Sequence, residues 1–356
     1  MTTATMKAAV VMAQGKEFSQ NLEVIEKEVP PPKKGEIMIK VARAATNTAD
    51  LKIVDGTLGF VFRPKPRFTL GHDFSGVISS IPEGVDAQGF AVGDRVCGFN
   101  VLAFQGECGT FAEYTCAMPQ HLFKVPTGVS FEEAAALPMA SSLIYPGLKD
   151  KLKIATGQKL LLFGGSTAIG LLGLAMARDF GCTDVVCTST SEALCKSFGA
   201  TKVVNYRTDD VVASLKSFEK SFDCAVDLAA GYKGWQQSPK LLKDGGKFLA
   251  AAFDDGRDAQ MGIGLIARML GANINRGFWS LCGYPTYIQY MQSGQVCAPY
   301  VQYFLDLQAS GKMPSILDAS QTPFAFTTAG FQAMMQKQQS GTCKGKLIMN
   351  ICPEIQ

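Results

Sequence analysis

The chain has 356 residues, which is too long for one ordinary hydrophobic core and fits two domains. Hydrophobic residues make up 47% of it and charged residues 18%, a composition that excludes intrinsic disorder. The formal net charge is only +3, and this excludes an electrostatic case for nucleic acid or an anionic membrane as the main partner.

The cysteines and the N-terminal segment predict a cytoplasmic protein. Eleven cysteines are present, an odd number, and none forms a C-x-x-C pair, so we expect reduced thiols. Residues 1–7 contain no apolar stretch of the kind found in secretory signals, and strand-like sequence begins at Lys7. No run of about 18 apolar residues predicts a membrane-spanning helix.

The first part of the chain, up to about Lys124, predicts a β-rich domain. Short apolar runs at 37–41, 76–81 and 94–99 have the character of strands. Gly and Pro turn signals separate these runs, as they do in barrels.

From Ser130 onward the pattern changes to alternating strands and helices. Ser130 and Glu133 predict a capping box at the start of a helix. We expect strands at 159–163, 184–188, 202–204, 222–227 and 246–251, helices at 171–180, 191–198 and 211–219, and a final helix and strand at 327–338 and 346–350. This alternation predicts an α/β domain with a doubly wound parallel sheet.

A glycine-rich turn follows the buried run at 159–163 and precedes a helix. Such a turn presents backbone N–H groups and a helix N-terminus to a pyrophosphate. The residues that we expect to bind the cofactor here are Gly165, Ser166, Thr167, Ala168 and Ile169. Thr167 holds the middle glycine position of G-x-G-x-x-G, so it must either sit back from the phosphate or donate its hydroxyl. The alternative is a tight strand–helix turn that binds no nucleotide.

The end of the next strand predicts which dinucleotide binds. An NAD site usually has an acidic residue about 20 residues after the glycines, to hold the ribose 2′-hydroxyl. Here Thr188, Ser189 and Ser191 occupy that stretch, and no acid occurs before Glu192. Neutral hydroxyls tolerate a 2′-phosphate, so NADPH is the expected cofactor. The alternative is that these residues only cap the following helix.

Several motifs along the chain point to one family. They are N-T-A-D at 47–50, G-H-D-F-S-G at 71–76, V-G-D-R-V at 92–96, G-T-F-A-E-Y at 109–114, F-E-E-A-A-A-L-P at 131–138 and Gly345–Lys346. In this order they resemble the medium-chain dehydrogenase/reductase superfamily. The likeness is to its zinc-independent branch of quinone oxidoreductases, zeta-crystallin and enoyl reductases.

The resemblance implies a fold and a set of site residues. It implies a GroES-like β-barrel domain of residues 1–130, completed by 316–356, and a Rossmann domain of residues 131–315. It further implies that Asn47 lies near the nicotinamide, that Tyr206 contacts the 2′-phosphate with Ser191 where a Lys is common, and that Phe253, Phe278 and Lys346 belong to the cofactor site. The alternative for the two Phe residues is packing between the domains.

The same resemblance predicts that the protein has no metal. Zinc-dependent relatives hold the catalytic zinc with a Cys and a His. This chain has Asn47 in place of the Cys and keeps the His as His72. A single imidazole and an amide cannot complete a tetrahedral zinc site. The region of the structural zinc lobe contains only Cys97 and Cys108. Reduction of a conjugated carbonyl or a quinone needs no metal, so we expect that activity.

Two further features concern the substrate. Tyr145 is a candidate proton relay, with packing between domains as its alternative and solvent as another proton source. In the loop at 52–70, Phe60 and Phe62 could form a lid and Arg63, Lys65 and Arg67 could meet an anionic carrier, or the loop is simply solvated. No Tyr lies between Asn47 and Gly71, which argues against the enoyl thioester reductases.

Three functions therefore remain open. The first is an NADPH-dependent reductase of enones, enals or quinones. The second is a trans-acting enoyl reductase of a polyketide or fatty acid pathway, and the third is a non-catalytic NADPH-binding scaffold or sensor. The branch also implies a homodimer that pairs through the edge strand of the Rossmann sheet, which we expect near 271–277.

Overall fold

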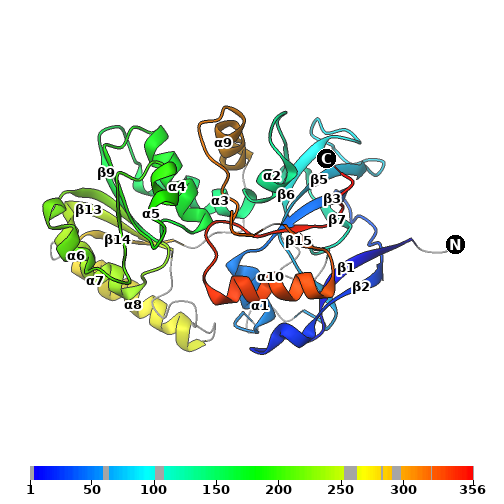
Figure 1. The fold of residues 1–356 in the computed structure, drawn as a ribbon, viewed down its shortest axis with the longest axis horizontal. Helices are drawn as coiled ribbons and strands as arrows, with labels where there is room; N and C mark the ends of the chain where they lie inside the picture. Colours follow the sequence, from blue (N-terminus) through cyan, green and yellow to red (C-terminus); the bar gives the residue numbers. More distant parts are fainter. Residues whose placement is uncertain are drawn as a thin grey trace. The chain divides into compact units, whose positions relative to one another are not determined.

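The chain divides into two compact units, each described here by itself (Figure 1). The computed structural model describes residues 4–58, 64–100, 108–251, 263–281, 284–290, 298–321 and 323–355. The first unit is Met1–Ser142 with Gly294–Gln356, and the second is Leu143–Ser293.

The first unit is built mainly from antiparallel strands. Its three-stranded sheet has the order β2-β1-β4, and its seven-stranded sheet has the order β15-β16-β3-β5-β6-β8, with β7 paired to β3. The strands are β1 (Thr5–Val11), β2 (Leu22–Glu28), β3 (Ile37–Ala45), β4 (Phe68–Thr69), β5 (Asp73–Ser80), β6 (Arg95–Phe99), β7 (Tyr114–Ala117), β8 (Leu122–Lys124), β15 (Phe324–Ala325) and β16 (Ile348–Asn350). Strands from both ends of the chain therefore share one sheet, since β16 pairs antiparallel with β3.

Short helices connect and cover these strands. They are η1 (Phe18–Asn21), α1 (Thr48–Val54), η3 (Pro119–His121), α2 (Phe131–Ala135), α9 (Ala298–Ala309) and α10 (Thr328–Ser340), while α3 (Pro138–Pro146) runs from the first unit into the second. The predicted capping box opens α2. The backbone N–H of Glu133 donates to Ser130 Oγ at 3.2 Å, and Glu133 Oε2 accepts from the N–H of Ser130 at 3.2 Å.

The second unit contains the predicted parallel sheet. Its six strands have the order β11-β10-β9-β12-β13-β14, and every neighbouring pair is parallel. The elements are η4 (Gly147–Leu152), β9 (Lys159–Phe163), α4 (Ala168–Asp179), β10 (Asp184–Thr188), α5 (Glu192–Ser197), β11 (Lys202–Val204), α6 (Val211–Ser214), η5 (Lys216–Phe218), β12 (Phe222–Asp227), α7 (Tyr232–Leu241), β13 (Leu242–Ala250), α8 (Ile263–Leu281) and β14 (Thr286–Gln289). The apolar run of β9 is explained by its place inside the sheet, where both faces are covered.

Two expectations for the second unit were wrong in detail. The helix expected at 211–219 is split into α6 and the 3₁₀ turn η5. The edge strand expected near 271–277 is part of α8, and the edge strands of the sheet are β11 and β14. Leu270, Ile274 and Phe278 recur every four residues, which is the spacing of a helix and not of a strand.

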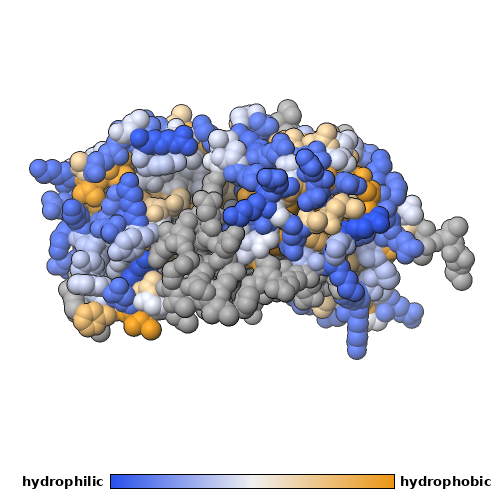
Figure 2. All heavy atoms as spheres, turned by 90° about the horizontal axis from the view of Figure 1, so that it is seen from below, coloured by the Kyte–Doolittle hydropathy of each residue, from blue (hydrophilic) through white to orange (hydrophobic). Residues whose placement is uncertain are grey.

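Within the described part of the chain, no helix combines the length and the apolar composition that crossing a membrane requires. Among the residues coloured by hydropathy in Figure 2, most of those on the face drawn are hydrophilic, and apolar side chains reach it in a few separate places.

Candidate functional site

The glycine-rich turn connects β9 to α4 as the sequence predicts. Gly164 has a φ of +95°, a conformation that glycine adopts without strain. Thr167 is the N-cap of α4, where its Oγ1 accepts from the N–H of Gly170 at 2.9 Å and donates to the carbonyl of Gly164 at 2.9 Å. The Thr167 hydroxyl thus donates its hydrogen within the turn. How Thr167 is placed beside a phosphate stays a prediction.

Close packing explains why glycine occupies positions 165 and 170. A Cβ added to Gly170 would lie 2.3 Å from the carbonyl oxygen of Gly164, and one added to Gly165 would lie 2.5 Å from Cys187 Sγ. The turn is therefore shaped by contacts that no larger residue permits. Gly164 was missed by the sequence analysis, because a spacing pattern does not reveal which glycine has a positive φ.

The turn fits a pyrophosphate. The 12-residue helix α4 starts directly after it, and the backbone N–H groups of Ala168 and Ile169 have no carbonyl one turn earlier to bind. These N–H groups and the positive end of the helix dipole form a site suited to phosphate oxygens. Ser166 precedes them in the same turn, half-buried.

The hydroxyls at the end of β10 have different surroundings. Thr188 Oγ1 accepts from the N–H of Gly164 at 3.1 Å, and Ser189 Oγ accepts from the N–H of Ser191 at 3.0 Å. Ser191 Oγ is buried and has no hydrogen-bond partner within the described part of the chain. Ser191 precedes α5 but makes no side-chain cap bond. Its hydroxyl thus has no partner among the described residues, whereas the other two fix the turn.

Tyr206 follows the neighbouring strand. It lies two residues after β11, which pairs in parallel with β10, and its side chain is 50% exposed. Carboxyl ends of adjacent parallel strands meet at one edge of the sheet, so Ser191 and Tyr206 lie near the same edge. That Tyr206 contacts a 2′-phosphate stays a prediction.

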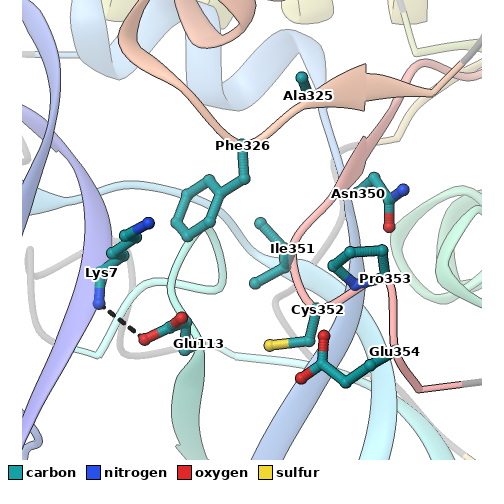
Figure 3. A pocket seen from close by; sticks show the side chains of 9 residues that line it. All are labelled: Lys7, Glu113, Ala325, Phe326, Asn350, Ile351, Cys352, Pro353 and Glu354. Atoms are coloured by element: carbon teal, nitrogen blue, oxygen red, sulfur yellow. Dashed lines mark hydrogen bonds between the residues drawn. The ribbon is translucent and has the colours of Figure 1, made fainter.

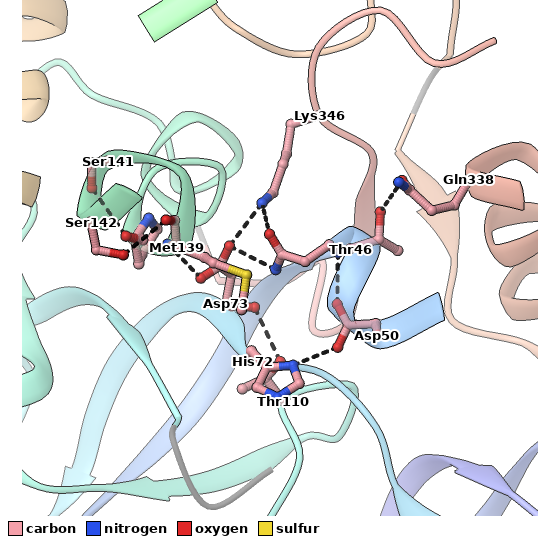
Figure 4. Close-up of polar contacts among 12 residues, drawn as sticks. Thr46, Asp50, His72, Asp73, Thr110, Met139, Ser141, Ser142, Gln338 and Lys346 are labelled. Atoms are coloured by element: carbon pink, nitrogen blue, oxygen red, sulfur yellow. Dashed lines mark hydrogen bonds and ion pairs between the residues drawn. The ribbon is translucent and has the colours of Figure 1, made fainter. Parts of the chain in front are cut away.

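Asn47 belongs to a buried polar cluster in the first unit, of which Figure 4 labels Asp73, Met139 and Lys346. Asn47 Nδ2 donates to Asp73 Oδ2 at 3.0 Å, while its Oδ1 accepts from Lys346 Nζ at 2.5 Å. Lys346 Nζ also lies 2.8 Å from Asp73 Oδ2, and the backbone N–H of Met139 donates to Asp73 Oδ1 at 2.9 Å. Lys346, which we expected to bind the cofactor, therefore contacts the candidate catalytic residue Asn47.

His72 lies in the same region as part of a second buried pair. Its Nδ1 lies 2.6 Å from Asp50 Oδ1, and its ring stacks on Phe99 with a centroid distance of 5.6 Å. Asp50 Oδ2 accepts from the backbone N–H of Asn47 at 2.6 Å, so the two pairs are connected. Among the described residues, no group of three or more His, Cys, Asp or Glu side chains could hold a metal ion.

Tyr145 lies near the end of α3 and is almost fully buried. Its hydroxyl accepts from Lys149 Nζ at 2.8 Å. This bond raises the pKa of Lys149, so the exposed ammonium stays charged beside the phenol. Lys149 belongs to η4, a π-helix that follows Pro146. The sequence analysis missed Lys149, although its four-residue spacing from Tyr145 is the usual signal for a contact on one helix face.

Among the described residues, the structure does not bring the remaining candidates together. Phe253, and Phe60, Phe62 and Arg63 of the loop, lie outside the described residues. Lys65 and Arg67 are exposed, and Phe278 is 60% exposed on α8. Asp73 was quoted within a motif but not predicted as a site residue. Its partner Lys346 lies 273 residues away in the sequence, too far for local spacing to connect them.

A surface pocket in the first unit is separate from this cluster (Figure 3). Its volume is about 340 Å³, and Glu113 in its wall accepts from the backbone N–H of Lys7 at 2.8 Å. Its lining consists of Lys7, Glu113, Ala325, Phe326, Asn350, Ile351, Cys352, Pro353 and Glu354. None of these residues belongs to the glycine turn or to the Asn47 cluster, so the pocket is no part of the candidate site.

Comparison with known sequences gives two domain matches and many reductases. Residues 33–127 match the alcohol dehydrogenase GroES-like domain, and residues 168–292 match the zinc-binding dehydrogenase domain. Dehydrogenase pigH of Monascus ruber is 32% identical over 65% of this chain and 67% of its own length. Trans-enoyl reductase pgmF of Aspergillus terreus is 27% identical over 89% of this chain and 86% of its own length. The 2-methylene-furan-3-one reductase of Solanum lycopersicum is 31% identical over 61% and 55%.

Solved structures share the whole fold. The quinone oxidoreductase from Coxiella burnetii has a TM-score of 0.78 and 22% identity, covering 98% of this chain and 100% of its own. The Escherichia coli quinone oxidoreductase complexed with NADPH has a TM-score of 0.77 and 20% identity, with the same coverage. At these identities the likeness concerns architecture, and it confirms the predicted pair of a GroES-like unit and a Rossmann unit.

Proposed function

The chain belongs to the medium-chain dehydrogenase/reductase superfamily, and from that membership we propose that it is a reductase which transfers a hydride from NADPH to a small conjugated carbonyl compound or a quinone. Its relatives and the Rossmann unit make it an oxidoreductase with a nicotinamide coenzyme. The preference for NADPH, the substrate class and the roles of individual residues are the proposal.

The residues at the end of β10 support NADPH over NADH. Ser191 Oγ is buried there without a partner among the described residues, and Thr188 and Ser189 bring no charge. The first acidic residue, Glu192, is exposed and paired with Lys196 at 2.8 Å. A 2′-phosphate placed here meets a free hydroxyl donor and no carboxylate. Tyr206 and the exposed Arg207 follow the adjacent strand and offer further donors.

The substrate class rests on the relatives and on the chemistry of the Asn47 cluster. The named relatives reduce enoyl groups and a methylene-furanone, and similar folds reduce quinones. The bound coenzyme supplies the hydride. Asn47 fixes polar groups beside the reacting atoms, while Tyr145, with Lys149 bonded to its hydroxyl, is the candidate proton relay, or water takes that role.

A cofactor titration tests the proposal. We expect wild-type protein to bind NADPH more tightly than NADH, and the double variant Ser191→Ala, Tyr206→Phe to lose that preference while its affinity for NADH stays the same. Fluorescence of the bound reduced nicotinamide gives both dissociation constants. Thr190→Ala, a hydroxyl removed from an exposed neighbouring position, is the control and should behave as the wild type. Equal affinities of the wild type for the two cofactors would refute the selectivity.

A second candidate is a trans-acting enoyl reductase, which the names of several relatives favour. Exposed Lys65 and Arg67 would then contact the acidic carrier that presents the substrate. Turnover with enones, quinones and acyl thioesters on a carrier separates the two candidates, since only the second predicts a higher KM for the carrier-bound thioester in Lys65→Glu, Arg67→Glu. Binding of NADPH without turnover on every substrate supports the third candidate, a scaffold or sensor.

We further propose a cellular compartment, an assembly and domain bounds for the protein. The protein works in the cytoplasm, where its nine described cysteines, none of which is in a disulfide, remain reduced. It forms a homodimer through the Rossmann unit. Residues 131–315 form the coenzyme-binding domain, and 1–130 with 316–356 form the catalytic domain.

A further inference from the structure

The family resemblance implies that Lys346 belongs to the cofactor site, but the proposed function gives the charge of its ammonium no part in the reaction. Its side chain is 4% exposed and its partner Asp73 is fully buried, so the ion pair lies almost out of contact with water. Taking an ammonium and a carboxylate out of water costs several kcal/mol each, and their attraction only partly offsets that cost. A purely structural contact would be as well served by apolar residues of similar size.

The backbone around Lys346 does not need this ion pair to stay in place. The N–H of Lys346 donates to the carbonyl of Ile316 at 2.9 Å, and its carbonyl accepts from the N–H of Asp318 at 3.0 Å. The following strand, β16, pairs with β3 from Ile348 to Asn350. Main-chain hydrogen bonds thus hold the segment on both sides of Lys346. The ion pair of its ammonium with Asp73 is not needed to fix the position of the segment.

The ammonium is held in one orientation. Asp73 Oδ1 accepts from the N–H of Met139, and Asp73 Oδ2 accepts from both Asn47 and Lys346. Asn47 in turn presents Oδ1 to Lys346. An ammonium has three N–H donors, and the described residues give this one two acceptors. One donor therefore remains, on a group that cannot turn away (Figure 4).

We propose that Lys346 is the electrophile of the reaction: its ammonium, positioned by Asp73 and Asn47, donates its third N–H to the substrate carbonyl oxygen. This inference rests on the proposed function and names the group that activates the substrate. Zinc-dependent relatives hold a metal ion with the residue at the Asn47 position. Here a fixed ammonium bonded to Asn47 supplies positive charge in that region.

A hydride adds to the β-carbon of the conjugated carbonyl, and its donor NADPH is oxidised to NADP⁺. The C=C pair becomes the new double bond between the α-carbon and the carbonyl carbon, and the C=O pair moves onto the oxygen, which gives the enolate. Lys346 keeps its proton and stabilises that oxygen by a charge-assisted hydrogen bond. The α-carbon then takes a proton from water or from Tyr145. With a quinone, the same ammonium stabilises the hydroquinone oxyanion.

Kinetics of Lys346→Met are the first test. Loss of one donor to an oxyanion lowers kcat by about a hundredfold to a thousandfold, and we expect NADPH affinity to stay within about twofold of the wild type. Lys344→Met removes a charge from an exposed position on the same segment and is the matched control. Lys346→Arg keeps the charge in a different geometry and should give an intermediate kcat even if the Met variant fails to fold.

The pattern across substrates separates catalysis from a structural role. The loss of kcat in Lys346→Met should be greatest for weakly activated enones and smallest for strongly activated ones. Strongly activated enones stabilise the negative charge of the enolate by their own substituents and depend less on the ammonium. An equal loss for all substrates, or a loss confined to NADPH affinity, overturns the proposal.

A binding measurement provides a readout apart from turnover. We use 4-nitrophenol, whose phenolate resembles the enolate oxygen and absorbs at a different wavelength from the phenol. On the complex of wild-type protein with NADP⁺, the bound probe should contain more phenolate than the free probe at the same pH. No excess of phenolate on the wild type, or the same excess on Lys346→Met, overturns the proposal.

Failure of this inference is distinguishable from failure of the proposed function. If the wild type reduces enones or quinones but Lys346→Met reduces them equally well, Lys346 is not the electrophile and the reductase function stands. If the wild type consumes no NADPH with any substrate, the proposed function itself is wrong.

Discussion

At the scale of single residues, the candidate cofactor site depends on contacts too close for any side chain. Substituting Gly170→Ala places a Cβ 2.3 Å from the carbonyl oxygen of Gly164, within the backbone of the turn. We expect the free energy of unfolding to fall by about 1–3 kcal/mol, the usual cost of overpacking. NADPH binding should weaken as well, because the turn must open to make room.

Urea unfolding and the fluorescence titration measure these two effects. Gly15→Ala is the control, since nothing lies within 4 Å of its added Cβ and its φ is not positive. A Gly170→Ala protein with wild-type stability and wild-type NADPH affinity would contradict this account of the turn.

The thiol of Cys182 gives a prediction that depends on pH. Burial, with a smaller contribution from Asp223, raises the pKa of Cys182 from 9.0 to about 11. The thiolate is the reactive form, so raising the pKa by about 2 units makes alkylation near pH 8 roughly a hundredfold slower than in the unfolded chain. The rate should rise about tenfold per pH unit up to about pH 11.

Mass spectrometry of the Cys182 peptide after timed treatment with iodoacetamide measures the rate, with urea-unfolded protein as the reference. Fast alkylation of native protein at pH 7, at the unfolded rate, would show that the partial burial of Cys182 does not raise the pKa of its thiol.

Candidate site residues could be predicted from the sequence where the signal was local. The span 165–169, the hydroxyls of β10 and Asn47 each follow from a motif or from a family pattern. The contact of Asp73 with Lys346 did not emerge, because tertiary folding makes it across 273 residues, while the contact of Lys149 with Tyr145 was missed although their spacing of four residues indicates it.

At the scale of elements, the strands of the Rossmann unit were predicted most reliably. The strands at 159–163, 184–188, 202–204 and 222–227 are found with the predicted bounds, because a strand covered on both faces is a continuous apolar run. Helix α8 was missed for the opposite reason. The region was assigned by analogy to a family edge strand, although its own apolar spacing predicts a helix.

Helix α8 also contains a position that can be improved. Gly271 lies inside the helix, and an added Cβ would have nothing within 4 Å. We expect Gly271→Ala to raise the free energy of unfolding by about 0.5–1 kcal/mol, because alanine loses less backbone freedom in a helix. Urea unfolding measures the change, and Gly245→Ala, where φ is +75°, should destabilise instead. A loss of stability in Gly271→Ala would mean that this part of α8 is not helical.

At the scale of the whole molecule, the pattern of the chain predicted a β-rich unit followed by an α/β unit with a parallel sheet. That both chain ends belong to the first unit was implied by the family resemblance, and the structure has them there. Assembly could not be anticipated in the same way, because it depends on which surfaces remain uncovered after folding.

The proposed homodimer can now be located on the second unit. Strand β14 pairs only with β13 within the described residues, and the N–H of Tyr287 donates to Ser280 Oγ of α8 at 3.2 Å, so no described strand covers its outer edge. The adjacent helix α8 exposes Ile274 by 75% and Phe278 by 60%. Exposed apolar side chains next to an open sheet edge are typical of a surface that another chain covers. A second copy placed about a twofold axis would cover both features at once.

Light scattering tests the assembly. We expect wild-type protein to have twice the mass of one 38.1 kDa chain. Ile274→Glu places a charge in the proposed contact and should shift the mass to that of one chain, because a buried unpaired carboxylate costs several kcal/mol. Val92→Glu is the matched control, since Val92 is 63% exposed in the first unit, and its mass should stay that of the wild type. A wild type with the mass of one chain at micromolar concentration, or an Ile274→Glu protein that remains dimeric, would place the contact elsewhere or remove it.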